Sequence, residues 1–288
     1  MTELQKIEFE LLKNFVEICD RYNLTYYLVC GSALGAAKYQ GFIPWDDDID
    51  VALPRKDYEI FLEKAQELLP EHVFLQNYRT EKYFYVLGSK LRDSRTTYIE
   101  KGIEHLPINH GVFIDIFPLD GYPVEEKEIR LFERKKMYYY RRRYVRLRPI
   151  IHRDIGLTIC SCLHRLFGMY SDTEKYVREN EQLNKKYPVG KSKLWCNYAN
   201  SKSKLEYAPQ WHYGVGTTMK FEGLDVRIPE KYDEYLTQKY GDWRADLPKE
   251  KQVGHHYYEV CDLDTPYTEY LEKLPNGLVR IKNPDKSK

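Results

Sequence analysis

The chain has 288 residues and a formal net charge of +1, with 45 Lys and Arg against 44 Asp and Glu. This near-balance excludes a positive field over the whole chain, so we expect no nucleic-acid partner. The six cysteines show neither the spacing of a zinc site nor a disulfide framework. The sequence also lacks a signal-like start and any run of 18 apolar residues, which together predict a protein with reduced thiols in the cytoplasm.

The first predicted element is an amphipathic helix over residues 4–18, where apolar side chains recur at helical spacing. Thr2 and Gln5 have the spacing of a capping box in front of this helix. Asn23 suits the exit of the helix, because asparagine tolerates the left-handed backbone conformation that ends many helices.

An apolar run over residues 24–30 predicts a buried strand, which ends at Gly31 and Ser32 and is followed by a short helix over 33–38. A strand, a turn of small residues and a helix N-terminus together form a phosphate cradle, because free backbone N–H groups and the helix dipole point at the anion. Glycine lets the backbone approach the phosphate closely, and the serine hydroxyl can donate to it.

Residues 46–50 hold four carboxylates in five positions: Asp46, Asp47, Asp48 and Asp50. Crowded carboxylates repel one another unless a cation lies among them. If this segment continues as a strand, alternation places the side chains of Asp48 and Asp50 on one face. Such oxygen ligands suit Mg²⁺, with Mn²⁺ as a second choice. An acidic surface turn is the alternative interpretation.

A helix is predicted from Pro54 onward, followed by strands over 73–76 and 83–92. In the second of these strands, Lys90 and Arg92 lie on one face. Two cations at this spacing could meet a diphosphate or its developing charge. Pairing with surface carboxylates is the alternative.

The segment 111–121 predicts a strand that carries Asp115 on the same face as Phe113 and Phe117. An aspartate in the middle of an apolar strand is rarely buried without a partner. Asp115 is therefore a candidate functional carboxylate. A capping or turn carboxylate is the alternative.

Residues 134–153 include nine Lys or Arg, several Tyr and no acidic residue, and residues 155–170 are largely apolar. A basic and aromatic segment followed by an amphipathic one is typical of contact with an anionic membrane surface. A polyanionic acceptor or nucleic acid would suit the same charges. An exposed helical face beside a helical hairpin is the alternative that involves no ligand.

His255 and His256 follow a Tyr-Gly-Asp-Trp stretch at residues 240–243. A histidine here could contact a donor phosphate or assist proton transfer. Neighbouring side chains point in different directions in a regular element, so at most one of the two is expected to act. A structural or exposed pair is the alternative.

Three segments of the chain, 30–35, 41–50 and 113–118, together resemble the LicD family. The wider pattern resembles the nucleotidyltransferase superfamily, in which a Gly-Ser turn, an Asp-x-Asp strand and a carboxylate on a later strand share one site. The resemblance covers residues 1–125 well and returns more weakly over 232–256.

The resemblance implies an α/β fold of the α+β kind, with a nucleotidyltransferase-like mixed sheet flanked by helices. Residues 1–125 would form the catalytic core, and 126–200 a helical insertion of basic and amphipathic character. Residues 201–288 would complete the active site.

The resemblance also implies roles for the candidate site residues. Asp48, Asp50 and Asp115 would hold the metal and act in catalysis, while Asp46 and Asp47 would orient the backbone or the metal-bound waters. The remaining candidates would bind the phosphates of the donor: Gly31, Ser32, Lys90, Arg92, His255 and His256.

Members of the family are phosphocholine transferases that decorate bacterial surface glycans, and their fukutin-type relatives transfer polyol phosphates. The resemblance therefore implies a metal-dependent transfer of phosphocholine from CDP-choline, or of a related group from another CDP-alcohol. The acceptor would be a hydroxyl of a lipid-linked or surface glycan, of the teichoic acid or lipopolysaccharide type, and the enzyme would work at the inner face of the cell membrane.

Three alternative functions stay open at this point. The first is a polyol-phosphate transferase that uses CDP-ribitol or CDP-glycerol. The second is a nucleotidyltransferase that moves NMP to an acceptor. The third is a non-enzymatic adaptor that binds anionic glycan or membrane through its basic segment, which the complete set of carboxylates makes the least favoured.

Overall fold

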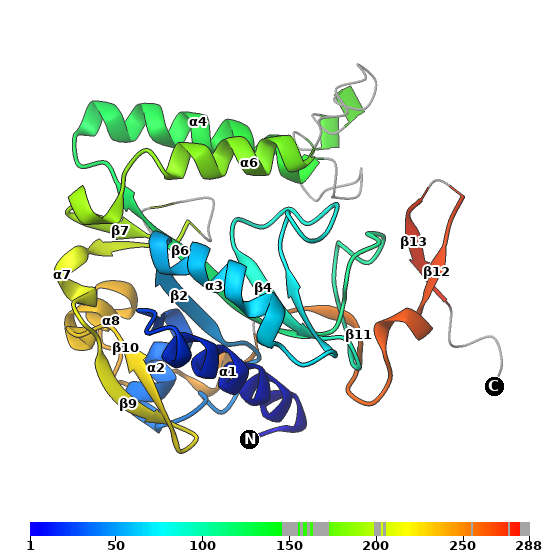
Figure 1. The fold of residues 1–288 in the computed structure, drawn as a ribbon, viewed down its shortest axis with the longest axis horizontal. Coiled ribbons are helices and arrows are strands. Elements are labelled where there is room, and N and C mark those ends of the chain that lie inside the picture. Colours follow the sequence, from blue (N-terminus) through cyan, green and yellow to red (C-terminus); the bar gives the residue numbers. More distant parts are fainter. Residues whose placement is uncertain are drawn as a thin grey trace.

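The structure of the chain is a computed structural model and shows a mixed α/β fold with helices packed around a central sheet (Figure 1). The predicted fold class is confirmed. Across the described residues, no helix combines the length and the apolar character needed to cross a bilayer. The structure describes residues 1–145, 155, 158–159, 162–163, 173–198, 203, 206–254, 256–275 and 277–282.

The central sheet contains parallel and antiparallel neighbours in the order β1-β2-β6-β4-β3. Strands β2 and β6 are parallel, whereas β1 pairs antiparallel with β2, and β4 pairs antiparallel with both β6 and β3. Strands β7 and β8 extend the sheet from the end of β6. The bounds of these strands are β1 Tyr27–Leu28, β2 Asp50–Pro54, β3 Val73–Gln76, β4 Ser89–Asp93, β6 Val112–Tyr122, β7 Leu194–Cys196 and β8 Tyr207–Pro209.

Helices α1 (Glu3–Arg21) and α3 (Arg55–Leu68) lie across the sheet side by side (Figure 1). Helix α1 begins with the predicted capping box, in which Thr2 and Gln5 bond reciprocally, and it buries one apolar face. Asn23 has a φ of 50° directly after the helix, as expected for a left-handed exit.

Two predicted strands are shorter in the structure than the sequence indicates. The strand predicted over 24–30 is confirmed only for Tyr27 and Leu28, because Cys30 has a φ of 53° and begins helix α2 (Cys30–Tyr39). The strand predicted over 83–92 begins at Ser89. Local apolar character therefore overestimated the length of both strands.

The predicted helical insertion contains a pair of helices, α4 (Glu126–Val145) and α6 (Thr173–Asn184), which lie against each other (Figure 1). An ion network ties this pair to the sheet. Arg55 of α3 donates to Asp120 of β6 (2.8 Å) and to Glu181 of α6 (2.9 Å). The network is buried, so the helical pair has a fixed attachment to the core.

The basic segment is divided between the interior and the surface of α4. Lys136 and Arg143 are buried, at 0% and 2% exposure, and Arg143 donates to the carbonyl of Tyr85 (2.9 Å). Arg134, Lys135 and Arg141 are exposed. The rest of the basic segment and most of the predicted apolar stretch lie outside the described residues.

The C-terminal part adds small elements around the core. Strand β11 pairs antiparallel with β5. This pairing holds the C-terminal part of the chain against the N-terminal part. The other elements form hairpins and short helices at the periphery (Figure 1). Their bounds are β5 Thr97–Glu100, α7 Gln210–Tyr213, β9 Thr217–Phe221, β10 Leu224–Ile228, α8 Tyr232–Tyr240, β11 Tyr258–Asp262, β12 Leu271–Lys273 and β13 Val279–Ile281, with 3₁₀ turns η1 Val189–Lys191, η3 Lys249–Lys251 and η4 Tyr267–Glu269.

Candidate active site

The acidic loop comprises residues 46–50 and leads into strand β2. The predicted strand does not start at Asp48 but two residues later, at Asp50, so Asp48 lies in the irregular segment directly before the strand. Asp50 faces Asp115 of β6 in the parallel register, and the Asp115 amide donates to the carbonyl of Ile49 (2.8 Å). Two of the three predicted catalytic carboxylates are therefore neighbours on adjacent strands.

Burial and mutual repulsion act on the carboxylates of the acidic loop. Burial, followed by the charges of Asp48 and Asp47, raises the pKa of Asp46 to about 8. Burial and the charges of Asp48 and Asp115 raise the pKa of Asp50 well above its ordinary value. Burial also raises the pKa of Asp48, although His256 opposes this shift. Each of these carboxyls would be stabilised in its ionised form by an additional cation.

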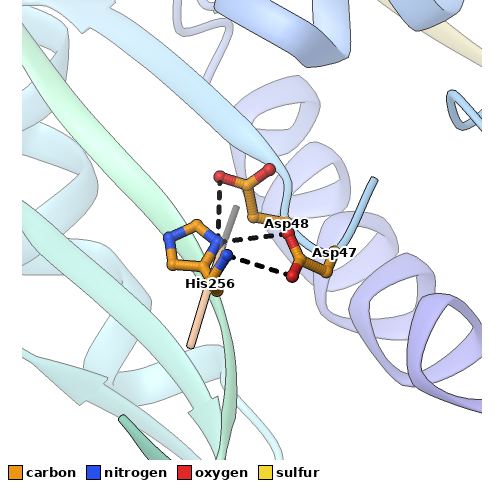
Figure 2. A group of neighbouring side chains, drawn as sticks. All are labelled: Asp47, Asp48 and His256. Atoms are coloured by element: carbon orange, nitrogen blue, oxygen red, sulfur yellow. Dashed lines mark hydrogen bonds and ion pairs between the residues drawn. The ribbon is translucent and has the colours of Figure 1, made fainter. Parts of the chain in front are cut away.

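His256 reaches the acidic loop from the far end of the chain, because β11 pairs with β5 directly after it. Figure 2 shows its ring pointing at the carboxylates of Asp47 and Asp48. Its Nδ1 lies 3.4 Å from Asp47 Oδ1 and 3.7 Å from Asp48 Oδ2, and its backbone N–H donates to Asp47 Oδ2 (3.1 Å). Burial would lower the pKa of His256, but the bond to Asp47 and the charge of Asp48 raise it to about 9. His255, the other predicted histidine, lies outside the described residues.

Two glycines allow the acidic loop to lie this close to its surroundings. A Cβ on Gly31 would lie 2.8 Å from Asp46 Oδ2, and a Cβ on Gly254 would collide with Asp47 Oδ2. On the other side, Gln5 of α1 donates through Nε2 to the backbone carbonyl of Asp46 (3.0 Å). The loop is thus held by its backbone and by close packing, and not by side-chain bonds alone.

The N-terminus of helix α2 lies beside the loop and carries two predicted phosphate-binding residues. Gly31 and Ser32 fall in the first turn of this helix. The Ser32 hydroxyl is buried and accepts a hydrogen bond from the Asp50 amide (2.8 Å). Ser32 therefore fixes the start of β2 against the helix. The Cys30 and Ala33 amides are bonded to Tyr235 and Val29, so the amides of Gly31 and Ser32 are the part of the predicted cradle for an anion.

The two predicted cations of β4 form one buried chain with the third carboxylate. Lys90 Nζ lies 3.4 Å from Asp115 Oδ2 and 3.6 Å from Glu100 Oε1. Arg92, at 1% exposure, donates to Glu100 Oε2 (2.8 Å), to the Gln76 side chain (2.5 Å) and to the carbonyl of Gly111 (2.6 Å). Burial would raise the pKa of Glu100, but the two cations lower it to about 2.

Glu8 is a further acidic residue near the loop, and the sequence analysis missed it. Its side chain is buried at 2% exposure, and its Oε2 has no hydrogen-bond partner among the described residues. Burial and the charges of Asp48, Asp47 and Asp46 raise its pKa well above the ordinary value. The signal was present, since helical periodicity places Glu8 on the apolar face of α1 together with Leu11.

A divalent cation fits this group of residues. One ligand atom each from Asp47, Asp48 and His256 lies within 4.8 Å of the other two. Oxygen and imidazole ligands suit a divalent ion, and its charge would offset the repulsion between the crowded carboxylates. Asp50 and Asp115 complete the acidic surroundings. The assignment of Asp48, Asp50 and Asp115 as the metal-binding set stays a prediction.

A cavity of about 310 Å³ opens beside the acidic loop. Gly31 at the N-terminus of α2 lines it, together with three carboxylates of the loop. The cavity therefore brings a phosphate-binding helix end and a cation-binding cluster to one space. Four aromatic side chains also line it: Tyr39, Trp45, Tyr240 and Trp243.

The comparisons with known proteins assign this mixed sheet and its acidic loop to a transferase enzyme with a nucleotidyltransferase-like domain. Residues 23–154 match the family model described as the nucleotidyltransferase domain of LicD/FKTN/FKRP. The chain carries a domain of this family, and the predicted resemblance is confirmed.

Three curated proteins are similar to the chain. It is 28% identical over 281 residues to the lipopolysaccharide cholinephosphotransferase LicD of Haemophilus influenzae, which covers 90% of this chain and 97% of that protein. It is 30% identical over 115 residues to an uncharacterized protein of Rickettsia prowazekii, which covers 40% of each chain. It is also 32% identical over 87 residues to an uncharacterized protein of Rickettsia typhi, which covers 30% of this chain and 26% of the other.

Proposed function

We propose that this enzyme transfers phosphocholine from CDP-choline to a hydroxyl of a bacterial surface glycan of the lipopolysaccharide type. The observation that carries the proposal is an acidic cluster at the N-terminus of α2, in a chain that aligns over 90% of its length with a lipopolysaccharide cholinephosphotransferase. A teichoic acid precursor is the second acceptor to be tested.

The diphosphate of the donor would bind at the first turn of α2. The backbone N–H groups of this turn have no partners within the helix, and the positive end of the helix dipole favours an anion. Gly31 has no side chain to keep the phosphates away from these groups. Ser32 holds the helix end against Asp50, so the cradle and the acidic loop keep a fixed relative position.

Asp48, Asp50 and Asp115 would hold a divalent ion, Mg²⁺ or Mn²⁺, with Asp47 and His256 beside them. When bound, such an ion neutralises charge on the diphosphate and on the departing CMP. The protein residues around it then have two tasks. They align the attacking hydroxyl, and they remove its proton.

Asp115 is the residue that we assign to the proton of the attacking hydroxyl. A carboxylate can accept this proton only if it is ionised and positioned. The Lys90 ammonium, 3.4 Å from Asp115 Oδ2, fixes the direction of this carboxylate. Arg92 pairs with Glu100, and Glu100 also pairs with Lys90. The part of Arg92 is therefore to position Lys90 and not to contact the donor.

The acceptor is proposed to be lipid-linked, and the enzyme to work at the inner face of the cell membrane. The support is the row of exposed cations on α4, Arg134, Lys135 and Arg141, which suits an anionic surface. Lys136 and Arg143 of the same helix are buried and are therefore not part of this exposed set.

The test is a donor screen with purified enzyme, Mg²⁺ and a deacylated lipopolysaccharide or teichoic acid acceptor. The proposal expects CMP release and phosphocholine incorporation from CDP-choline, and neither product with Asp48→Asn. The exposed Asp225→Asn is the matched control and should keep wild-type turnover, since its carboxylate lies on the β9–β10 hairpin. Turnover of CDP-glycerol or CDP-ribitol alone would overturn the choline assignment, and pyrophosphate release from an NTP would show nucleotidyl transfer instead.

A further inference from the structure

The cavity beside the acidic loop has a negative wall with no available cation among its lining residues. Asp46, Asp48, Asp50 and Asp242 line it, against a single basic residue, Lys38. The Lys38 ammonium is already engaged, because its Nζ donates to the carbonyls of Arg244 (2.9 Å) and Ala245 (3.0 Å) and to the carboxylate of Asp246 (2.8 Å). Asp48 and Asp50 are assigned to the metal, so Asp46 and Asp242 are the carboxylates that leave the rest of the cavity negative and favour a positively charged occupant.

The aromatic side chains of the cavity fall into two pairs. Tyr39 and Trp243 already face internal cations, with Lys38 Nζ at 5.5 Å from the ring centre of Tyr39 and Arg244 Cζ at 4.2 Å from that of Trp243. Within the part of the chain that the structure describes, no cationic side chain lies over the ring of Trp45 or of Tyr240. These two rings keep a face for an external cation.

The two residues lie on elements that are anchored to their neighbours. Trp45 meets Tyr39 edge-on, with ring centres 6.4 Å apart and planes at 78°. Tyr240 is the last residue of α8, a helix whose Tyr235 hydroxyl accepts from the Cys30 amide (3.2 Å) at the start of α2. Both rings are therefore placed by elements that also build the phosphate-binding end of the site.

A quaternary ammonium is the cation that best suits these walls. It has no N–H to donate, and it is held by aromatic faces and by nearby negative charge. The volume of about 310 Å³ lies at the low end for ligand pockets, so it suits one end of a CDP-alcohol and not the whole donor. A cytosine could stack on the rings and donate its amino group to one carboxylate, but it carries no positive charge to match the negative wall.

We infer that this cavity is the head-group pocket of the enzyme, and that Trp45 and Tyr240 determine its specificity for choline over a neutral alcohol. The inference rests on the proposed function, because it takes the donor to be a CDP-alcohol. It goes further by naming the residues that select the alcohol.

The test compares CDP-choline with its neutral isostere, CDP-3,3-dimethylbutanol, in which carbon replaces the ammonium nitrogen. Trp45→Ala and Tyr240→Ala should each reduce the ratio of the two kcat/KM values roughly 2- to 30-fold, the range for the loss of one cation–π contact. Trp45→Phe and Tyr240→Phe keep a ring and should retain most of the ratio, which separates recognition from misfolding. Trp211→Ala is the matched control, since Trp211 is 56% exposed and lines a different hollow.

A second measurement does not depend on turnover. The N-methyl signal of phosphocholine should show saturation transfer from aromatic protons of the wild-type protein in NMR, and this transfer should weaken in Trp45→Ala but not in Trp211→Ala. Two results would overturn the head-group pocket. The first is an unchanged kcat/KM ratio in both alanine variants. The second is saturation transfer to the cytosine protons of CMP in the wild type, if this transfer is lost in the same variants. The proposed function fails separately, if the wild-type enzyme releases no CMP from CDP-choline with any acceptor.

Discussion

Removing the charge of Lys90 should show how strongly this buried cation stabilises the carboxylates of the site. It is 5% exposed, and its ammonium lies between Asp115 and Glu100, 3.2 Å from the ring centre of Phe113. The substitution Lys90→Met keeps the aliphatic stem and removes only the charge. The two carboxylates then lose the cation that lies between them.

The distances set the size of the effect. At an effective dielectric constant of 20, ion pairs at 3.4 Å and 3.6 Å are each worth about 5 kcal/mol before the cost of desolvation is subtracted. Breaking a buried pair by removing one partner typically costs about 3–5 kcal/mol. We therefore expect Lys90→Met to lower the free energy of unfolding by about 3–5 kcal/mol, and to lower kcat because Asp115 is no longer oriented.

Urea denaturation followed by circular dichroism, at pH 7 in the presence of a chelator, measures this loss. Adding Asp115→Asn to Lys90→Met should recover part of it, because Asp115 is the carboxylate left without its cation, whereas Glu100 keeps Arg92 at 2.8 Å. The exposed Lys220→Met, which breaks a surface pair with Asp225, should change stability by less than about 1 kcal/mol. A loss below about 1 kcal/mol in Lys90→Met, or strict additivity in the double variant, would refute the reasoning.

Three other predictions follow from the same structure. Gly254→Ala should push Asp47 away from His256 and reduce kcat without loss of circular dichroism, whereas Gly190→Ala, with open space around its Cβ, should leave kcat unchanged. Burial and the nearby Arg92 lower the pKa of His110 to about 4, so its neutral form stabilises the fold above pH 6.5 and this stability is lost as the pH falls toward 4. Between pH 7 and pH 4 the wild type should therefore lose about 3 kcal/mol more than His110→Gln in urea titrations, and parallel curves would contradict this. In flotation with anionic liposomes at low salt, Arg134→Glu combined with Arg141→Glu should reduce binding, and a wild type that does not float would remove the membrane proposal.

The parts of the fold that the sequence predicted correctly depend on local signals. The capping box of Thr2 and Gln5, the helix after Pro54 and the strand at 73–76 each follow from residues within a few positions of one another. Asp115 was recognised because a carboxylate interrupts an apolar strand, and the structure places it in register with Asp50. The face of a strand can be read from alternation alone.

The parts that the sequence could not predict depend on distant segments. The role of Asp47 follows from its contact with His256, which exists only because β11 pairs with β5. Glu8 reaches the loop through the packing of α1 on the sheet. Arg92 shares a strand face with Lys90, yet it bonds to Glu100 and Gln76, a choice that alternation does not reveal.

The pairing of β11 with β5 has a consequence for how the enzyme matures. Asp47 and its imidazolium partner are 209 positions apart along the chain. During synthesis on the ribosome, the acidic loop emerges long before that partner, and its repulsion is then relieved only by ions from the surrounding fluid. The site as we propose it is therefore complete only after β11 has been synthesised and has paired with β5.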